Sequence, residues 1–577
     1  MASIPETERA VTSKYWSWLL GLAARFVMNR LLKRLGKHWL VQLASSLDLA
    51  PLEKACAAFH HAQGPGAPPQ HTVARLVRAL MVKYLMDLSL RETEEALQRD
   101  LLLKWFVGYG LWEDTPDHTT LERFELWVIA HKTRLFFDQT LEQIDRDLPE
   151  ERERPQLIDS YALRSRAARV SLVTLLRQMA RKLLEALAEA HPLRHTLLLE
   201  QLDRQALFGS REEDHHWSRA EVRQKALQAL VPQVWRCRSA AQEALKDTPP
   251  SDKQRALRDW LDRLNKVLQD ELVVQEPTKV DDRWQVRECT PQERGHYRIA
   301  SATDPEATYR DHGKDHPAEL GYNLSILTTT RIVREVQAET GASPDDQAVG
   351  ALLRSQQEHH DVTPTTLIGD GAYARGKTHA EVAEISGGQT QMVTPPPAYD
   401  KRTERFGPYD FSLSDDGSTL TCPHEVASTQ HYASGSGEGE GWRFTAAMCA
   451  GCPLWAKCRD PHSPASAHRM VFISQFRAYV LKSGVYAKGA QYKALIKLRP
   501  MVERVIFCLT NLHGDREAAR FGQHNAWFQA LMHSTAFNLR QWMRLRAAQQ
   551  RPEIVCAIAC ERAYTEDALV ECVLKAA

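Results

Sequence analysis

Three acidic residues occur where carboxylates from separate segments could be gathered. Asp159 follows the apolar run in PQLIDS and Asp370 follows the one in TTLIGD, and each run is predicted to be a strand ending near its aspartate. Glu503 comes three residues after Pro500, so it is expected in the first turn of a helix. Carboxylates at strand ends can hold divalent cations. Taken singly, each acid is more often a cap, a turn or a surface residue.

A second set of residues could bind a softer metal. Cys449 and Cys452 form a C-x-x-C pair, Cys458 follows after five residues, and Cys422 lies upstream. Four thiolates with one close pair suit a structural Zn²⁺ ion. The alternative is a set of free thiols in a reducing compartment, and the residues that could replace Cys422 as a ligand are His424 and His431.

Basic residues concentrate in two parts of a chain whose net charge is only +1. Residues 11–45 contain six Lys or Arg and no acids, and residues 469–546 contain thirteen basic residues against three acids. Local basic surfaces favour binding to a polyanion such as DNA. The alternative is a solvated face that is balanced by acids elsewhere.

The elements that must position these residues change along the chain. Apolar periodicity predicts helices over most of the first 150 residues, and again over about 168–273 and from about 474 to the mid-540s. Between them, strands are predicted at Asp159, at HYRIASATD, as a hairpin in GYNLSILTTTRIVREVQAET, before Asp370 and at QTQMVTP, with helices over 345–359 and 377–385. This order indicates a mixed α/β sheet.

Bulk properties limit the class of protein. The 577 residues are too many for one compact core, so several domains or large insertions are expected. The N-terminal residues do not resemble a secretory signal, and no uncharged apolar run is long enough to span a membrane. Eleven cysteines without such a signal indicate a reducing compartment, so a cytoplasmic protein is expected.

Several motifs in one order resemble a known family. The chain is similar, over roughly residues 70–545, to bacterial insertion-sequence transposases of the DDE type, in the group numbered eleven-eighty-two. The motifs that carry the resemblance are PDHTTLERF (116–124), LIDSYALRS (157–165), ASATDPEA (300–307), GYNLSI (321–326), LIGDGAYA (367–374), CAGCPLWAKC and RPMVERVIFCL.

The resemblance implies a ribonuclease-H-like catalytic core in which Asp159, Asp370 and Glu503 form the acidic triad. It implies Mg²⁺ or Mn²⁺ as cofactor, because two divalent ions can activate the attacking oxygen and stabilise the leaving oxygen of a phosphodiester. The implied partners are double-stranded DNA, as the terminal inverted repeats of the element and as target DNA, and a second copy of the chain on that DNA. The implied location is the bacterial cytoplasm, at the nucleoid.

These expectations divide the chain into five parts. They are an all-helical DNA-binding or dimerisation domain, a catalytic α/β domain in three pieces, a helical insertion, a small cysteine-rich zinc insertion and a C-terminal tail. In that order the boundaries are 1–150; 151–166, 290–400 and 474–548; 167–289; 401–473; and 549–577.

The last motif departs from the family pattern, which carries Tyr, Arg, Glu and Lys at fixed spacing. Arg499 and Glu503 fit, but Ile496 occupies the tyrosine position and Thr510 the lysine position. The alternatives to an active transposase are therefore a decayed DNA-binding relic and a nuclease of the same fold. The residues expected to contact DNA are Arg499, Arg504, Arg516, Arg520, Arg25, Lys33 and Arg34.

Overall fold

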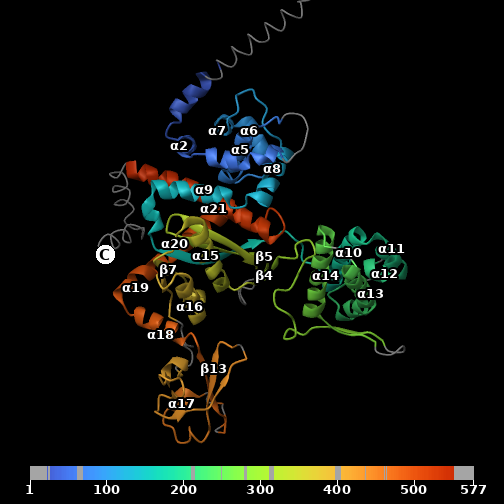
Figure 1. Cartoon of the computed structure of the whole chain (residues 1–577), viewed down its shortest axis with the longest axis vertical. Coiled ribbons are helices and arrows are strands. Elements are labelled where there is room, and N and C mark those ends of the chain that lie inside the picture. Colours follow the sequence, from blue (N-terminus) through green and yellow to red (C-terminus); the bar gives the residue numbers. More distant parts are fainter. Residues whose placement is uncertain are drawn as a thin grey trace, which may run out of the picture.

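The computed structural model describes most of the chain (Figure 1). The described residues are 23, 26–61, 69–209, 213, 215–247, 250–277, 283–310, 318–396, 405–435, 437–459, 462, 464 and 466–550. Arg25 and almost all of the predicted tail lie outside them. No helix in the described part of the chain combines the length and the apolarity needed to cross a bilayer.

A six-stranded mixed sheet forms the centre of the molecule. Strand β5 pairs antiparallel with β1 along one edge and with β4 and β6 along the other, and β7 and β8 extend the sheet in parallel beyond β1. This mixed order is compatible with a ribonuclease-H-like core. The strands are β1 (Gln156–Arg164), β4 (Thr308–Arg310), β5 (Glu319–Thr328), β6 (Val333–Thr340), β7 (Thr366–Ile368) and β8 (Gln391–Val393).

Two helical layers cover this sheet. One face packs on α15 and α16 through a cluster that includes Ile158, Leu352 and Val382. The other face packs on α20, α21 and α9 through a larger cluster that includes Leu157 and Val505. The helices are α9 (Leu135–Asp147), α15 (Val349–His360), α16 (Gly376–Ile385), α18 (Arg477–Tyr486), α19 (Ala490–Leu495), α20 (Pro500–Leu512) and α21 (Gln523–Gln550), with short 3₁₀ turns η1 (Pro149–Arg152), η2 (Asp345–Ala348), η3 (Gly371–Tyr373) and η5 (Ile496–Leu498).

The N-terminal helices share the large hydrophobic cluster with the sheet. The cluster is continuous from Leu40 through Phe124 and Phe136 to Phe528 on α21. Residues 1–150 therefore do not have a separate hydrophobic core within the described part of the chain. The remaining helices here are α2 (Trp39–Ser46), α3 (Ala50–Cys56), α4 (Ala58–His61), α5 (Val73–Leu85), α6 (Leu90–Arg99), α7 (Leu101–Val107) and α8 (His118–His131).

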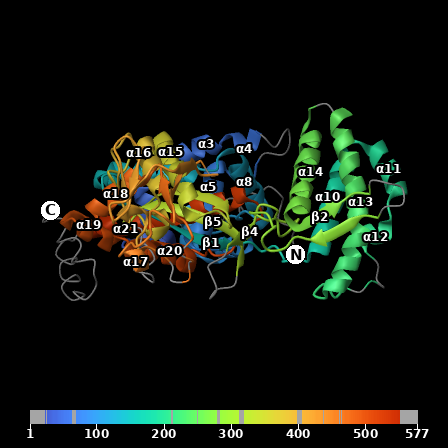
Figure 2. The same ribbon diagram turned by 90° about the horizontal axis from the view of Figure 1, so that it is seen from below.

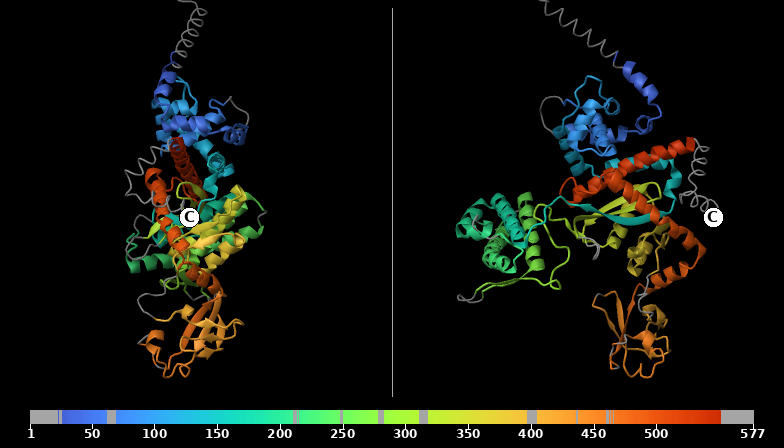
Figure 3. Two further views of the ribbon diagram at one scale, coloured as in Figure 1. Left: turned by 90° about the vertical axis from the view of Figure 1, so that its left-hand side faces the viewer. Right: turned by 180° about the vertical axis from the view of Figure 1, so that it is seen from behind.

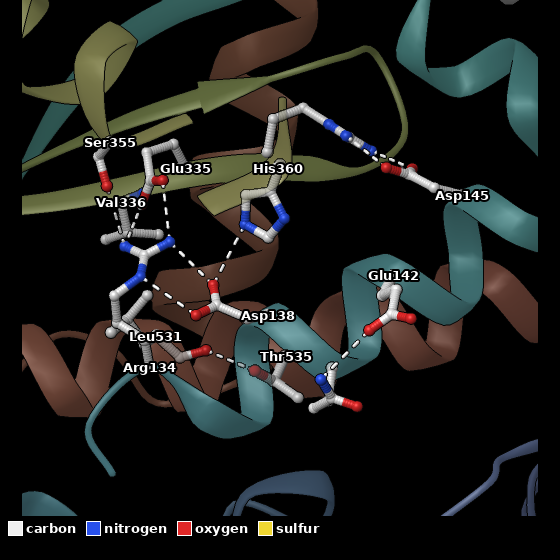
Figure 4. A network of polar contacts seen from close by, with 12 residues as sticks. Arg134, Asp138, Glu142, Asp145, Glu335, Val336, Ser355, His360, Leu531 and Thr535 are labelled. Carbon is white, nitrogen blue, oxygen red and sulfur yellow. Dashed lines mark hydrogen bonds and ion pairs between the residues drawn. The ribbon is translucent and has the colours of Figure 1, made fainter. Parts of the chain in front are cut away.

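Buried ion pairs reinforce this junction (Figure 4). Arg134, at the start of α9, pairs with Asp138 one turn later and with the fully buried Glu335 of β6. The ring of His360, at the end of α15, lies 3.1 Å from the same Asp138 carboxylate. Charges that are removed from water require such partners, so these contacts fix α9 against the sheet.

The predicted helical insertion forms a lobe beside the sheet (Figure 2). Its core is a second cluster, built from Leu and Val side chains of α10, α13 and α14 and closed by the β2–β3 hairpin. The elements are α10 (Leu172–Ala190), α11 (Pro192–Gln201), α12 (Arg204–Phe208), α13 (Ala220–Asp247), α14 (Asp252–Glu271), β2 (Leu272–Gln275) and β3 (Gln285–Glu288).

The cysteine module, defined here as the described residues of 405–474, lies at the opposite end from the N-terminal helices (Figure 3). Two small antiparallel sheets enclose its core. The elements are η4 (Pro408–Asp410), β9 (Ser412–Leu413), β10 (Leu420–Thr421), β11 (Ala427–Ser428), β12 (His431–Ala433), β13 (Gly439–Phe444), α17 (Trp455–Cys458) and β14 (Arg469–Ser474).

Two strand predictions were wrong. The strand with Asp159 does not end there but continues to Arg164, because its second half pairs with β5 from Ser160 to Arg164. The segment HYRIASATD forms no strand, and β4 begins only at Thr308. The buried Ile299, Ala300 and Ala302 of that segment produce the apolar signal: Ile299 and Ala302 pack against the insertion core. The hairpin, the two helices and the strands at 366–368 and 391–393 are confirmed.

Candidate active site

Strand register places the two aspartates side by side. Leu157 of β1 pairs in parallel with Ile368 of β7, and each aspartate follows its paired residue by two positions. Asp159 remains inside β1, where it opposes Ile326 of β5. Asp370 lies just past β7 and caps the turn η3, accepting a 2.8 Å hydrogen bond from the amide of Ala372. Asp370 therefore also has the turn role that its sequence allowed.

Glu503 reaches the same place from a helix. It lies in the first turn of α20, as predicted, and α20 packs against β1 through the buried Val502 and Val505. Its side chain is 58% exposed, compared with 15% for Asp159. Glu503 therefore faces solvent beside the two strand aspartates.

One cation joins the three acids. The Nη2 atom of Arg499 lies 3.7 Å from Asp159 Oδ2 and 3.6 Å from Asp370 Oδ2, and its Nη1 donates a hydrogen bond to Glu503 Oε1. Arg499 was predicted to contact DNA, whereas here it contacts all three predicted ligands. We call these four residues the acid site.

The electrostatic environment of Asp159 is unusual for a carboxylate. Burial is the main cause that raises the pKa of Asp159 to about 6, and the nearby charges of Asp370 and Asp345 contribute to the increase. The Ser160 amide and the Arg499 guanidinium act in the opposite direction. Partial burial beside other acids is an arrangement that cations stabilise.

Sequence reasoning missed a fourth carboxylate at this position. Asp345 accepts hydrogen bonds from the Ser160 hydroxyl (2.6 Å) and the Asn323 amide (2.9 Å), and it pairs with Arg310 at 3.3 Å. It therefore holds the residue that follows Asp159. Two adjacent acids at the start of a helical segment are typical of helix termini, so the pattern gave no separate signal.

The two departures from the family motif do not reach the acid site. The side chain of Ile496 packs against the large core. The hydroxyl of Thr510 donates a 2.9 Å hydrogen bond to the carbonyl of Ile506 in the same helix.

The residues predicted to contact DNA are dispersed. Lys33 and Arg34 are exposed in a helical segment that precedes α2, Arg504 is exposed next to Glu503, and Arg516 is exposed beside Arg164 at the other end of β1. Arg520 instead forms ion pairs at 3.1 Å with Glu122 and Glu125 of α8. These ion pairs connect α8, which carries most of PDHTTLERF, with the segment after α20. They give the positive charge of Arg520 a structural role that does not require DNA.

The four predicted cysteine ligands line one small cavity. The cavity, of about 30 Å³, is bounded by the four cysteines together with aromatic side chains and with Arg459 and Arg469. Burial raises the pKa of Cys458, and the charges of Cys449 and Cys422 raise it further, as expected for neighbouring thiols. The alternative ligands His424 and His431 do not line the cavity, and His431 stacks on Trp442.

The local backbone of the module brings the cysteines inward. Glu425 and Gly451 adopt left-handed conformations just after Cys422 and within the C-x-x-C pair, which turns the chain back at both places. Among the described residues, no three His, Cys, Asp or Glu side chains meet the geometry of a metal site. Zinc at the cysteines and a divalent ion at the three acids therefore both stay predictions.

Comparison with protein families gives two matches. Residues 29–125 match a transposase domain (DUF772), and residues 421–543 match a transposase DDE domain. The second match contains the four cysteines, Arg499 and Glu503, but neither strand aspartate. Both matches support an insertion-sequence DDE transposase, and neither identifies the group. No curated protein and no solved structure matches the chain.

Proposed function

We propose that this protein is a DNA transposase that cuts phosphodiester bonds at the ends of a mobile element and transfers the freed 3′-hydroxyl to target DNA. The observation that carries the proposal is the contact of one guanidinium with three carboxylates from β1, the β7 turn and α20. Three acids from separate elements concentrate negative charge that contributes nothing to the hydrophobic core, as expected of a site for cations.

The donor set fits Mg²⁺ or Mn²⁺. Asp159, Asp370 and Glu503 offer hard oxygen ligands, and partly exposed side chains leave room for water and for phosphate oxygens. Two divalent ions held there would supply the charge that activates the attacking oxygen and stabilises the leaving oxygen. The chain's own contribution is to orient the three carboxylates through the β1–β7 register and the first turn of α20.

Double-stranded DNA is the proposed partner, as terminal inverted repeats and as target, with two copies of the chain on it at the bacterial nucleoid. Lys33, Arg34, Arg504 and Arg516 supply exposed positive charge for phosphates. Because the N-terminal helices share their core with the sheet, binding should be measured on the whole chain rather than on a fragment.

The test for DNA contact is the double variant Lys33→Gln/Arg34→Gln. If both residues bind phosphates, the slope of log affinity against log salt should fall by about 2, about 1 for each lost contact. Lys182→Gln, on the distant insertion and paired with Glu185, is the control. An unchanged slope would leave the N-terminal segment a packing unit.

A structural Zn²⁺ ion in the cysteine module is the second cofactor that we propose. Cys422, Cys449, Cys452 and Cys458 would hold it, because all four line the same small cavity. Purified protein should then contain about one zinc per chain. Metal analysis without zinc, together with four reactive thiols, would contradict this.

A DNA-binding relic without cleavage activity is the second candidate function. It is favoured by Thr510, whose hydroxyl bonds within its own helix where the family pattern has a lysine. A plasmid that carries both element ends distinguishes the candidates. Cleavage that requires Mg²⁺ supports the transposase, cleavage without strand transfer supports a nuclease, and binding without cleavage supports the relic.

A further inference from the structure

Arg499 has an unusually exclusive set of partners. Every ion pair that the structure gives its guanidinium is with an acid of the acid site. Its Nε atom is buried and has no hydrogen-bond partner among the described residues. The residue is the N-cap of α20, so its backbone is fixed at the start of the helix that carries Glu503.

The Arg499 guanidinium occupies the space between the carboxylates where the proposed divalent ions would bind. The terminal nitrogens of Arg499 lie within 3.7 Å of carboxylate oxygens of Asp159 and Asp370. A divalent ion needs to approach such oxygens to about 2.0–2.1 Å, and it is strongly repelled by a cation this close. Because arginine does not deprotonate in proteins, it cannot yield the position by losing its charge.

The side chain is able to leave. It is 30% exposed, and rotations about its own bonds move the guanidinium while the helix stays in place. A phosphate offers the planar guanidinium a bidentate partner that replaces the lost carboxylates.

We propose that Arg499 is a displaceable counter-ion, which neutralises the metal-free acids and must move away before divalent ions bind. This inference rests on the proposed metal-dependent function. By linkage, a DNA phosphate that engages Arg499 raises metal affinity, and bound metal raises DNA affinity by the same factor. The three carboxylates are therefore released from Arg499, and made available to metal ions, mainly in the DNA-bound protein.

The test is Mn²⁺ affinity of the whole chain without DNA, measured from the electron paramagnetic resonance signal of free Mn²⁺. Arg499→Gln should bind Mn²⁺ at least about tenfold more tightly than the wild type, a factor equivalent to about 1.4 kcal/mol. The metal-free Arg499→Gln protein should also unfold at a lower temperature, because the three acids then repel. A purely structural role would lower the unfolding temperature without tightening metal binding.

Two further variants control the measurement. Lys182→Gln removes a positive charge from the distant insertion, where the lysine pairs with Glu185, and should leave Mn²⁺ affinity within about twofold of the wild type. Arg499→Lys keeps the charge as a single point that cannot contact three acids at once, so its affinity should be intermediate. Arg499→Lys also replaces Arg499→Gln as the test variant if Arg499→Gln does not fold. Equal or weaker Mn²⁺ binding by the Arg499 variants would overturn the inference.

The proposed function has a separate criterion of failure. If Asp370→Asn in the Arg499→Gln background binds Mn²⁺ as tightly as Arg499→Gln alone, the acids are not the metal ligands and the function itself is wrong. If Asp370→Asn weakens binding but Arg499→Gln does not tighten it, the function stands and only the counter-ion role is lost. Adding an end-containing duplex should tighten Mn²⁺ binding in the wild type more than in Arg499→Gln.

Discussion

The acid site and the cysteine module both gather ionisable side chains from distant positions in the sequence, but on different supports. The acid site stands on a six-stranded sheet and a helix whose core extends through the N-terminal helices. Three of the cysteines lie in or beside turns and Cys458 ends α17. The core of their module contains six buried apolar residues, Phe411, Leu420, Trp442, Phe444, Val471 and Ile473.

This difference indicates what each cluster does for the fold. The sheet would form without the three acids, because β1, β7 and α20 are held by buried Leu, Ile and Val side chains. A core of so few buried residues is expected to need further support, because small modules commonly need a metal or a cross-link. Changes at the acid site should therefore impair chemistry, and changes at the cysteines should impair folding.

Asp370→Asn should produce the largest effect on activity. The variant removes one charge and keeps the turn, since asparagine can still accept the bond from Ala372. Cleavage of element ends in Mg²⁺ should fall by at least about 10³-fold, the upper range for loss of one group that stabilises transition-state charge. The unfolding temperature without metal should be equal or slightly higher. A plasmid cleavage gel and calorimetry measure the two.

Asp159→Asn and Glu503→Gln are the matched variants. Combining either with Asp370→Asn should lower activity little further, because groups that act as a unit are not additive. Glu517→Gln, an exposed acid that pairs with Arg164, is the control and should cleave normally. Cleavage by Asp370→Asn at the wild-type rate would mean that Asp370 is only a turn residue.

The sequence allowed much of this site to be predicted, for local reasons. Short apolar runs and Pro500 made Asp159, Asp370 and Glu503 candidates, although β1 does not end at Asp159. The resemblance to DDE transposases is what joined them as a triad. Their proximity could not be derived from spacing, because it depends on the parallel register of β1 and β7 over residues more than 200 apart.

The contacts between these side chains could not be predicted from the sequence. Arg499 fits the family motif, which indicated a DNA contact, and only the packing of α20 on β1 directs it at the acids. Asp345 has the pattern of a helix-terminal acid, and its bond to Ser160 joins residues 185 apart. Arg520 likewise matched a DNA contact until its ion pairs with α8 were visible.

Cys452→Ser tests the other half of the comparison. If the cysteines hold zinc, the variant should lose metal and the local stability of the module should fall by about 4 kcal/mol, the range associated with loss of a metal. Limited proteolysis should cut within residues 405–474 first, while the sheet remains protected. Hydrogen exchange resolves the two regions in one sample.

The matched control is Cys508→Ser, because Cys508 is a partly buried residue of α20 that lies outside the module. It should retain zinc and leave the module protected. If Cys452→Ser unfolds nothing and keeps all cleavage, the thiols are free and the module is stable by its own core.

Asp515 sharpens the comparison, because its pKa is raised to the same value as that of Asp159 although it has no neighbouring Arg499. Burial, which outweighs the lowering effect of hydrogen bonds from Tyr161 and Gln529, raises the pKa of Asp515 to about 6, and the charge of Asp87 contributes to the increase. Unlike Asp159, Asp515 is completely buried, and among the described residues its hydrogen bonds come from Tyr161 and Gln529 rather than from a cation. An elevated pKa alone therefore does not mark the site; the gathering of acids around a cation does.

Asp515→Asn should give the smallest effect, a change in the pH dependence of stability. A carboxyl with a folded pKa near 6 and an unfolded pKa near 3.8 stabilises the protein below about pH 4 and loses this contribution as pH rises through 6. The loss is at most about 3 kcal/mol for a shift of roughly two units. The amide can keep both bonds, accepting from Gln529 and donating to the Tyr161 hydroxyl. In urea unfolding, the variant should equal the wild type near pH 4 and exceed it at pH 7.5, and a constant difference at both pH values would show that Asp515 does not titrate in this range.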